Sequence, residues 1–130
     1  MSSIAWLEIL NWNETQLTDL KNVGYQYVLQ GKYDIALKIY KALVTLNPND
    51  NYNNKILGSI YLELNNPLEA LNFYNQALKL DPDDAYTEMN RAKSLYLLGY
   101  HKQATQAMQK LSMSSNKKVA QEATSFLFIL

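Results

Sequence analysis

A repeat of 34 residues constrains the fold of this 130-residue chain more than any other feature of its sequence. The stretch YKALVTLNPNDNY, Tyr40–Tyr52, recurs as YNQALKLDPDDAY, Tyr74–Tyr86. A third, weaker copy follows, in which Asn116 takes the place of the repeated proline. Other residues keep the same period: Gly24 and Gly58; Tyr27 and Tyr61; Gly31 and Gly99, with Asn65 between them; Ala36, Ala70 and Ala104. Such self-similarity predicts a stack of small units, because one unit alone cannot bury its apolar face.

Each copy is predicted to be a pair of helices. Apolar residues recur three and four positions apart in two segments that a short turn separates, as in LKNVGYQYVLQ and YDIALKIYKALVTL. Gly24 and Gly58 stand inside the first helix of their pairs, where glycine costs about 1 kcal/mol relative to alanine. We interpret both as points of close approach, against which Tyr40 and Tyr74 of the second helices pack.

Prolines and polar residues predict where the helices end and begin. Pro48 and Pro82 end the second helices, because proline cannot continue a helix and restricts the residue before it. The residues that follow can cap the next helix: Asn49, Asp50, Asp83 and Asp84. The last segment, SSNKKVAQEATSFLFIL, is predicted to be a further helix that is capped by Ser115 or Asn116 and covers the end of the repeats with Val119, Ala123, Phe126 and Leu127.

These residues resemble the tetratricopeptide repeat, which has this period, small residues at the eighth and twentieth positions, aromatic residues at the eleventh and twenty-fourth, and proline near the end. The resemblance implies an all-α fold, a right-handed α-solenoid of about three helix pairs with a C-terminal capping helix and a short N-terminal helix. The usual tryptophan of the signature is Leu20, Asn54 and Glu88 here. The expected segments are an N-terminal helical segment, three repeats of which the third is degenerate, and the capping helix: 1–16, 17–50, 51–84, 85–115 and 116–130.

The composition argues against catalysis and nucleic-acid binding. Lys and Arg together number 12, and Asp and Glu together also number 12. The chain therefore lacks the net positive charge typical of proteins that bind nucleic acids or anionic membranes. It has no Cys and a single His, His101, which excludes most catalytic triads and thiolate metal sites. The acidic residues Asp81, Asp83 and Asp84 lack the ligand spacing of a calcium loop. We therefore expect a binding protein rather than an enzyme, with no catalytic residue, metal or cofactor.

The N-terminal segment MSSIAWLEILNW lacks the basic region and the cleavage site of a signal peptide. No stretch of the chain approaches the ~20 consecutive apolar residues that a membrane-spanning helix requires. A cytoplasmic location is therefore expected. The apolar residues of this segment predict either a cap over the first repeat or a homodimer contact, because exposed tryptophans anchor interfaces well; they are Trp6, Leu7, Ile9, Leu10 and Trp12.

The resemblance also implies a binding groove. In tetratricopeptide arrays the first helix of each pair lines the concave face, and four positions of each repeat meet the ligand. On this chain these are Thr18, Lys21, Tyr25 and Val28; Tyr52, Lys55, Ser59 and Leu62; Tyr86, Met89, Lys93 and Tyr96; with Leu29, Glu63 and Leu97 at the edge. Tyr gives a large contact area at small entropic cost and Met adapts its shape. We predict that the groove binds an extended peptide by its apolar side chains, with the three Lys holding backbone carbonyls or an occasional carboxylate.

One ligand class known for this fold is not expected. The arrays that grip the C-terminal carboxylate of heat-shock proteins use a clamp of Lys, Asn and Arg side chains. Lys21 matches that clamp, but the other clamp positions hold Tyr25, Ile56, Tyr86 and Asn90. The chain therefore lacks most of the side chains that such a carboxylate needs.

Three repeats followed by one helix, with a groove rich in Tyr and aliphatic residues, resemble the class II chaperones of bacterial type III secretion. The resemblance rests on the stretches YQYVLQGKYDIALKIYKALVTLNP, LGSIYLELNNPLEALNFYNQALKLDP and KKVAQEATSFLFIL. Those chaperones hold membrane-active translocator subunits in the cytoplasm before export. The resemblance implies that an extended apolar segment of a translocator-like protein binds in the groove. The alternative is a scaffold that joins folded subunits of a bacterial complex.

Overall fold

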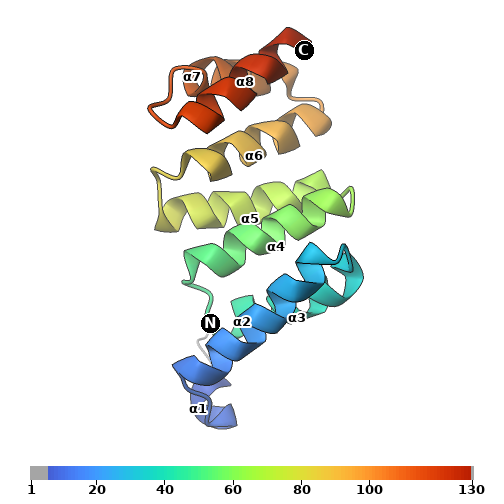
Figure 1. Cartoon of the computed structure of the whole chain (residues 1–130), viewed down its shortest axis with the longest axis vertical. Helices are drawn as coiled ribbons and strands as arrows, with labels where there is room; N and C mark the ends of the chain where they lie inside the picture. The colour runs from blue at the N-terminus through green and yellow to red at the C-terminus, as the bar shows by residue number, and fades with distance from the viewer. Residues whose placement is uncertain (1–5, 130) are drawn as a thin grey trace.

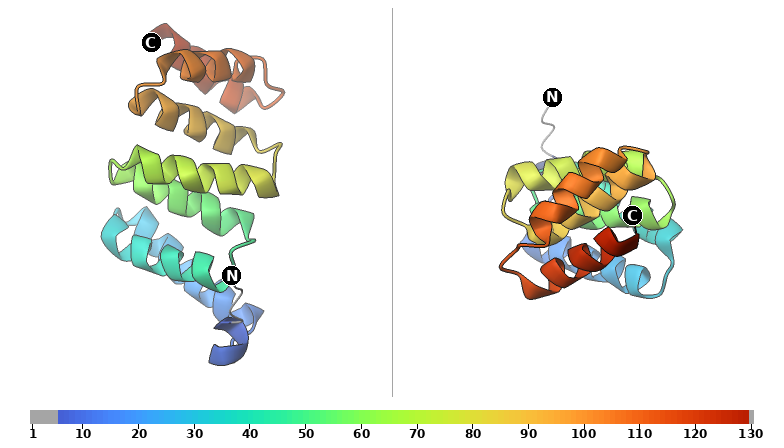
Figure 2. Two further views of the ribbon diagram at one scale, coloured as in Figure 1. Left: turned by 180° about the vertical axis from the view of Figure 1, so that it is seen from behind. Right: turned by 90° about the horizontal axis from the view of Figure 1, so that it is seen from above.

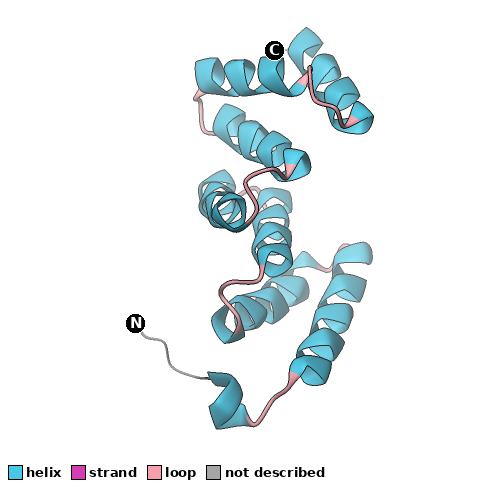
Figure 3. Cartoon of the chain, turned by 90° about the vertical axis from the view of Figure 1, so that its left-hand side faces the viewer, coloured by secondary structure: helices cyan, strands magenta, loops and turns pink. Residues whose placement is uncertain are grey.

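The computed structural model describes residues 6–129, and all of their regular structure is helical. Consecutive helices pack in pairs, and the pairs stack so that α1 and α8 lie at opposite ends of an elongated array (Figure 1). The same stacking is visible from behind in the left view of Figure 2, and the connections are short loops (Figure 3). The predicted all-α fold is confirmed. The helices are α1 (Trp6–Leu10), α2 (Glu14–Leu29), α3 (Tyr33–Leu46), α4 (Asn51–Glu63), α5 (Pro67–Leu80), α6 (Ala85–Leu97), α7 (His101–Leu111) and α8 (Lys117–Ile129).

The first helices of the three pairs end in the same way. Gly31, Asn65 and Gly99 follow α2, α4 and α6 with φ angles of 72°, 59° and 94°, in the left-handed region. Glycine enters this region freely, and asparagine does so more readily than most residues. The turn brings the backbone N–H of Lys32 within 2.9 Å of the carbonyl of Tyr27, and equivalent bonds recur in the other two pairs. This left-handed cap sends each second helix back along the first.

The other helix boundaries follow the predicted signals. Helices α3 and α5 both end two residues before a proline. The carboxylate of Asp50 accepts a hydrogen bond from the backbone N–H of Asn53 at 2.9 Å, and Asp84 caps α6 through Thr87 in the equivalent way at 3.3 Å. Of the two caps predicted for the last helix, Asn116 is the one that accepts a bond, from the backbone N–H three residues later. Each cap satisfies an amide that the helix itself leaves unpaired.

The helical glycines mark close approach between the two helices of a pair, as predicted. A Cβ atom added to Gly24 would lie 2.8 Å from Cε2 of Tyr40, and one added to Gly58 would lie 2.9 Å from Cε1 of Tyr74. Both tyrosines are buried. In the second helices, the repeated alanines are fully buried as well: Ala36, Ala70 and Ala104. In the first two pairs, the 34-residue period therefore records a glycine of the first helix that faces a tyrosine of the second.

Buried apolar side chains form two clusters along the stack. The first is shared by α3, α4 and α5 and includes Tyr40, Leu57 and Tyr74, with residues of α2 packed against it. The second is shared by α6, α7 and α8 and includes Met108 and Val119. Helix α8 covers the end of the repeats, as predicted, with Val119 and Ala123 fully buried and Phe126 and Leu127 packed against the second cluster.

Candidate functional site

A cavity of about 340 Å³ lies between α2 and α4, and two of the predicted groove tyrosines line it. Tyr25 lies in the C-terminal half of α2 and is 39% exposed, and Tyr52, in the first turn of α4, is half-buried. Lys21, Asn22 and Gln26 complete the lining, and we call the cavity the tyrosine pocket. The Nζ atom of Lys21 lies 5.1 Å from the centre of the Tyr52 ring, within the range of a cation–π contact. Such a lining can take an apolar side chain against its rings while its polar atoms stay hydrated.

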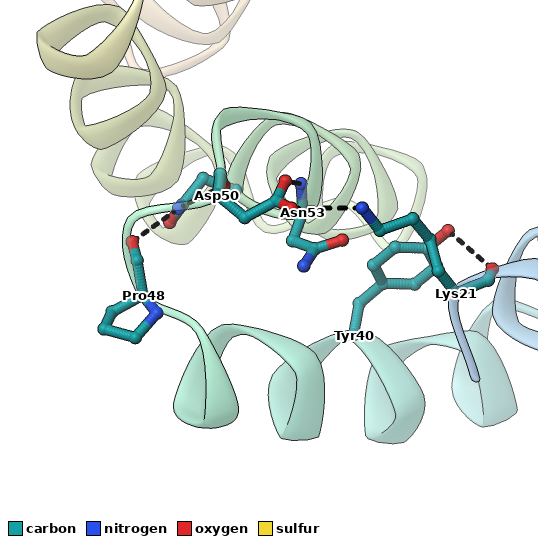
Figure 4. A network of polar contacts seen from close by, with 6 residues as sticks. Lys21, Tyr40, Pro48, Asp50 and Asn53 are labelled. Atoms are coloured by element: carbon teal, nitrogen blue, oxygen red, sulfur yellow. Dashed lines mark hydrogen bonds and ion pairs between the residues drawn. The ribbon is translucent and has the colours of Figure 1, made fainter. Parts of the chain in front are cut away.

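The predicted groove lysines are paired with carboxylates of the following helices. Lys21 Nζ lies 3.0 Å from Asp50 Oδ2 (Figure 4), and Lys55 Nζ lies 2.9 Å from Asp84 Oδ2, one repeat further along. Lys93 continues the series more loosely, with its Nζ 3.9 Å from a carboxylate oxygen of Glu122 in α8. The groove side of the array is therefore close to neutral where three cations had been predicted to face the ligand.

Each aspartate in this series has two roles. Asp50 and Asp84 cap α4 and α6, and they also bind the lysine of the preceding repeat. Burial by itself raises the pKa of the Asp84 carboxyl, but hydrogen bonds from Lys55 and Thr87 outweigh burial, so the net pKa lies below the ordinary value. The carboxylate is thus held charged, and its ion pair with Lys55 joins two adjacent repeats.

Buried tyrosine hydroxyls lie beneath the groove side of the first helices. The hydroxyl of Tyr40 donates to the carbonyl oxygen of Lys21 at 3.3 Å (Figure 4), and the hydroxyls of Tyr74 and Ser59 lie 2.9 Å apart. Burial raises the pKa of Tyr74 to about 12. It raises the pKa of Tyr40 as well, with a further contribution from the neighbouring Tyr52 phenol. Ser59, a predicted groove residue, is therefore already engaged with the core.

Asn54 was not expected to have any role beyond replacing the usual tryptophan. Its amide nitrogen donates to the backbone carbonyls of Pro48 and Asp50 at 3.0 and 2.9 Å, and the residue is only 1% exposed. It thereby fixes the loop that carries the Asp50 carboxylate toward Lys21. The sequence signal was the break in the signature itself: a small amide at a position where tryptophan would fill space.

The remaining predicted groove residues differ in exposure. Thr18, Tyr25, Leu29, Glu63, Tyr86 and Leu97 are exposed, and Lys21, Val28, Tyr52, Lys55, Ser59, Leu62, Lys93 and Tyr96 are half-buried. Met89 differs from the prediction, because it is 3% exposed and belongs to the second buried cluster. The reason is that α8 packs against α6 and covers this part of the third repeat.

Aromatic contacts close the C-terminal end of the predicted groove. The Tyr96 ring stacks on His101 with centroids 4.4 Å apart, and its edge meets Phe126 of α8 at 5.6 Å. His101 is exposed at the start of α7. Among residues 6–129, no group of three or more His, Asp and Glu side chains is placed to hold a metal ion.

The N-terminal segment lies partly against the array. Helix α1 is near α3, with Leu7 and Trp12 half-buried and Ile9 and Leu10 exposed. The side chain of Trp6 is outside the part that the structure describes. None of the described helices is long and apolar enough to cross a membrane.

Comparison with known proteins assigns the repeat. Residues 22–50 and residues 55–84 each match a family model of the tetratricopeptide repeat. Each match begins inside the first helix of a pair, α2 or α4, and includes the glycine and the tyrosine that are in contact in that pair. The chain is a tetratricopeptide repeat protein.

Curated relatives of this tetratricopeptide repeat protein are larger. Anaphase-promoting complex subunit 3 of Schizosaccharomyces pombe is 29% identical over 108 residues, which are 83% of this chain and 16% of that protein. The chain spans between 10% and 42% of the length of the curated relatives that it matches. These similarities reflect the repeat and do not carry over the activity of the whole relatives.

Solved structures match this tetratricopeptide repeat protein over nearly its whole length. PcrH in complex with the chaperone binding region of PopD has a TM-score of 0.83 at 23% identity, covering 91% of this chain and 92% of that one. The type III secretion chaperone SycD of Yersinia enterocolitica, in complex with a peptide of the translocator YopD, has a TM-score of 0.81 at 20% identity and covers 90% and 93%. The likeness at this level of identity is one of fold.

Proposed function

We propose that this protein binds an extended apolar segment of a secreted, translocator-like protein on the concave side of its repeats, and so acts as a chaperone of the type III secretion kind. The observation that carries the proposal is the tyrosine pocket between α2 and α4, with Tyr25 and Tyr52 at its wall. Tyr86 continues the row of partly exposed aromatic side chains onto α6. The likeness in fold to PcrH and SycD, each solved with a segment of a partner, supports the same use of the fold.

The electrostatics favour a ligand without a carboxylate at this surface. Lys21 and Lys55 each have an aspartate within 3.0 Å, so an incoming anion would have to compete with a partner that is already in place. An apolar side chain meets no such competition and removes apolar surface from water, which contributes about 25 cal/mol per Å². Binding alone shifts the partner toward its protected form, and no ATP is required.

The proposal is tested by capturing the partner. The tagged protein is used to retain proteins from its native cytoplasm, and the retained proteins are identified by mass spectrometry. Recovery of one membrane-active or aggregation-prone protein in stoichiometric amount is the expected result. The peptide that binds is then mapped, and its affinity is measured for Tyr25→Ala and Tyr52→Ala, each expected to weaken binding by roughly 5- to 30-fold. Tyr100→Ala, at an exposed tyrosine outside the predicted groove, is the matched control.

A scaffold that joins folded subunits is the second candidate. The observation that favours it is the match of most of this chain to a subunit of the anaphase-promoting complex, which by its name is part of an assembly. Recovery of several stable folded proteins, none of which aggregates alone, would support the scaffold over the chaperone. Unchanged partner affinity and solubility in both tyrosine variants would rule out the groove as the binding surface.

The N-terminal segment is proposed to act either as a cap or as a homodimer contact. Ile9 and Leu10 are exposed on α1, whereas Leu7 and Trp12 are half-buried. Sedimentation velocity separates the two roles, because a monomer at all concentrations discards the interface. A concentration-dependent dimer that Leu10→Glu dissociates would establish it.

A further inference from the structure

A second cavity, of about 670 Å³, lies at the junction of α5, α6 and α7. Arg91 and Glu88 reach it from α6, Asn75 and Lys79 from α5, and Lys110 from α7. With about 3.6 residues per turn, Glu88 and Arg91 lie on the side of α6 opposite Tyr86 and Lys93. The cavity, which we call the junction cavity, is therefore on the other side of α6 from the predicted groove.

The repeat explains why this cavity exists. At the equivalent junction one repeat earlier, Leu57 is buried at 1% exposure and Phe73 packs against the first cluster, where it stacks on Tyr61. One period later these positions are Arg91 and Ala107. A charged side chain and a small one thus replace two apolar side chains, and the division between the two buried clusters falls between α5 and α6.

The charges around the junction cavity are not balanced. Three cationic side chains line it, Arg91, Lys79 and Lys110, and Glu88 is the one anionic residue among the lining residues. Within residues 6–129, none of these three cations has a carboxylate oxygen within 4.0 Å. The Nε atom of Arg91 instead donates to the side-chain oxygen of Asn75 at 2.5 Å, which orients the guanidinium. The groove lysines, by contrast, are all paired.

The walls of the cavity are apolar between the charges. Leu78, Ala107 and the buried Leu111 contribute to the lining. The volume falls within the range of about 300–1,000 Å³ typical of ligand pockets, which is larger than an inorganic oxyanion needs. An oriented guanidinium next to apolar walls suits a carboxylate that is attached to an apolar neighbour, because Arg binds carboxylates with a planar pair of donors.

We propose that the junction cavity binds an acidic segment of a partner protein. In this arrangement a carboxylate of the segment reaches Arg91, further acidic side chains meet Lys79 and Lys110 at the rim, and an apolar side chain lies on Leu78 and Leu111. The repeats then carry two binding surfaces of opposite chemistry, a nearly neutral aromatic one and a cationic one. The second surface is independent of the proposed chaperone function.

The test uses a fluorescein-labelled peptide of alternating glutamate and leucine and measures its binding to the full chain by fluorescence anisotropy. The control peptide has glutamine in place of every glutamate. The acidic peptide is expected to bind, and its affinity is expected to fall as the salt concentration is raised, because salt screens exposed charges. Equal binding of the glutamine peptide, or no binding of the acidic one, overturns the proposal. Displacement of the acidic peptide by inorganic phosphate, beyond that by chloride of equal ionic strength, would instead identify a free-anion site and also overturn it.

Variants locate the site. The double variant Lys79→Glu and Lys110→Glu is expected to lower affinity for the acidic peptide roughly tenfold or more. The matched control, Lys41→Glu with Lys118→Glu, changes the net charge equally at exposed lysines outside the cavity lining and is expected to bind as the wild type does. Arg91→Leu restores the residue type of the preceding repeat, and it is expected to remove binding while retaining the helical circular dichroism spectrum. Wild-type affinity in the first double variant or in Arg91→Leu would refute the assignment.

Discussion

Replacing Gly58 with alanine should destabilise the protein although alanine is the better helix former. The added Cβ would lie 2.9 and 3.0 Å from two ring carbons of Tyr74 and 3.3 Å from the carbonyl oxygen of Ala70. The ring cannot swing away, because Tyr74 is buried and its hydroxyl is bonded to Ser59. Overpacking of this kind costs about 1–3 kcal/mol, and the gain in helix propensity offsets about 1 kcal/mol of it. The expected net loss is therefore about 1 kcal/mol.

Urea denaturation followed by circular dichroism measures this loss as a lower midpoint at unchanged slope. A double-mutant cycle then identifies its cause. In a Tyr74→Phe background the ring remains, so Gly58→Ala should still destabilise. In a Tyr74→Leu background the ring is gone, and the same change should become neutral or stabilising. A gain of about 1 kcal/mol on introducing Gly58→Ala into the wild type would mean that close approach is not the reason for the glycine.

Three further changes probe the polar contacts. Asn54→Ala leaves the carbonyls of Pro48 and Asp50 without their amide donor and should cost about 1–3 kcal/mol in urea denaturation; a loss near zero would show that water replaces the amide. Asp84→Asn keeps a capping side chain but loses the charge opposite Lys55, so at neutral pH it should cost less than about 1 kcal/mol. Because the pKa of Asp84 is lowered on folding, its charge stabilises the wild type fully above the unfolded pKa of about 3.9. This stabilisation is lost as the pH falls through the folded pKa, so the stability of Asp84→Asn should vary less over the same acidic range. An unchanged dependence of stability on pH would contradict the ion pair. The pKa of Tyr74 is raised to about 12 on folding, so the contribution of its protonated phenol to stability is complete below pH about 10. That contribution is lost as the pH rises from there toward the folded pKa. Tyr74→Phe should reduce this alkaline loss of stability, which thermal unfolding in matched buffers can measure.

Much of the fold could be predicted because the repeat records pair contacts directly. Gly58 and Tyr74 stand in the sequence as a small and a large residue at fixed positions, and the structure places them against each other. The caps Asp50 and Asp84 were predictable for the same reason, since they depend only on residues three positions away. What remained hidden was the second partner of each cap, Lys21 and Lys55, which lies 29 residues earlier in the chain.

Met89 shows where the period misleads. Met89 occupies the same position in its repeat as Lys55 does one repeat earlier, and Lys55 is half-buried beside the groove. The repeat register cannot foresee that α8 packs against α6 and buries Met89, because α8 has no counterpart in the first two repeats. The junction cavity was missed for a related reason. In the sequence, Arg91 only departs from the leucine, Leu57, that stands at the same position one repeat earlier. Whether the arginine side chain fills the equivalent space depends on the neighbouring helices.

The sequence by itself determined the helix pairs, their turns and their order, because each depends on contacts within one period or on residues a few positions apart. The tertiary structure decided which charges are paired and which surfaces stay open. Lys21 and Lys55 are neutralised by the next repeat, whereas Arg91, Lys79 and Lys110 gather around a cavity without a carboxylate within 4.0 Å in the described residues. The physical reason is that the pairing of charges depends on distance in space, and the stacking of helices sets that distance.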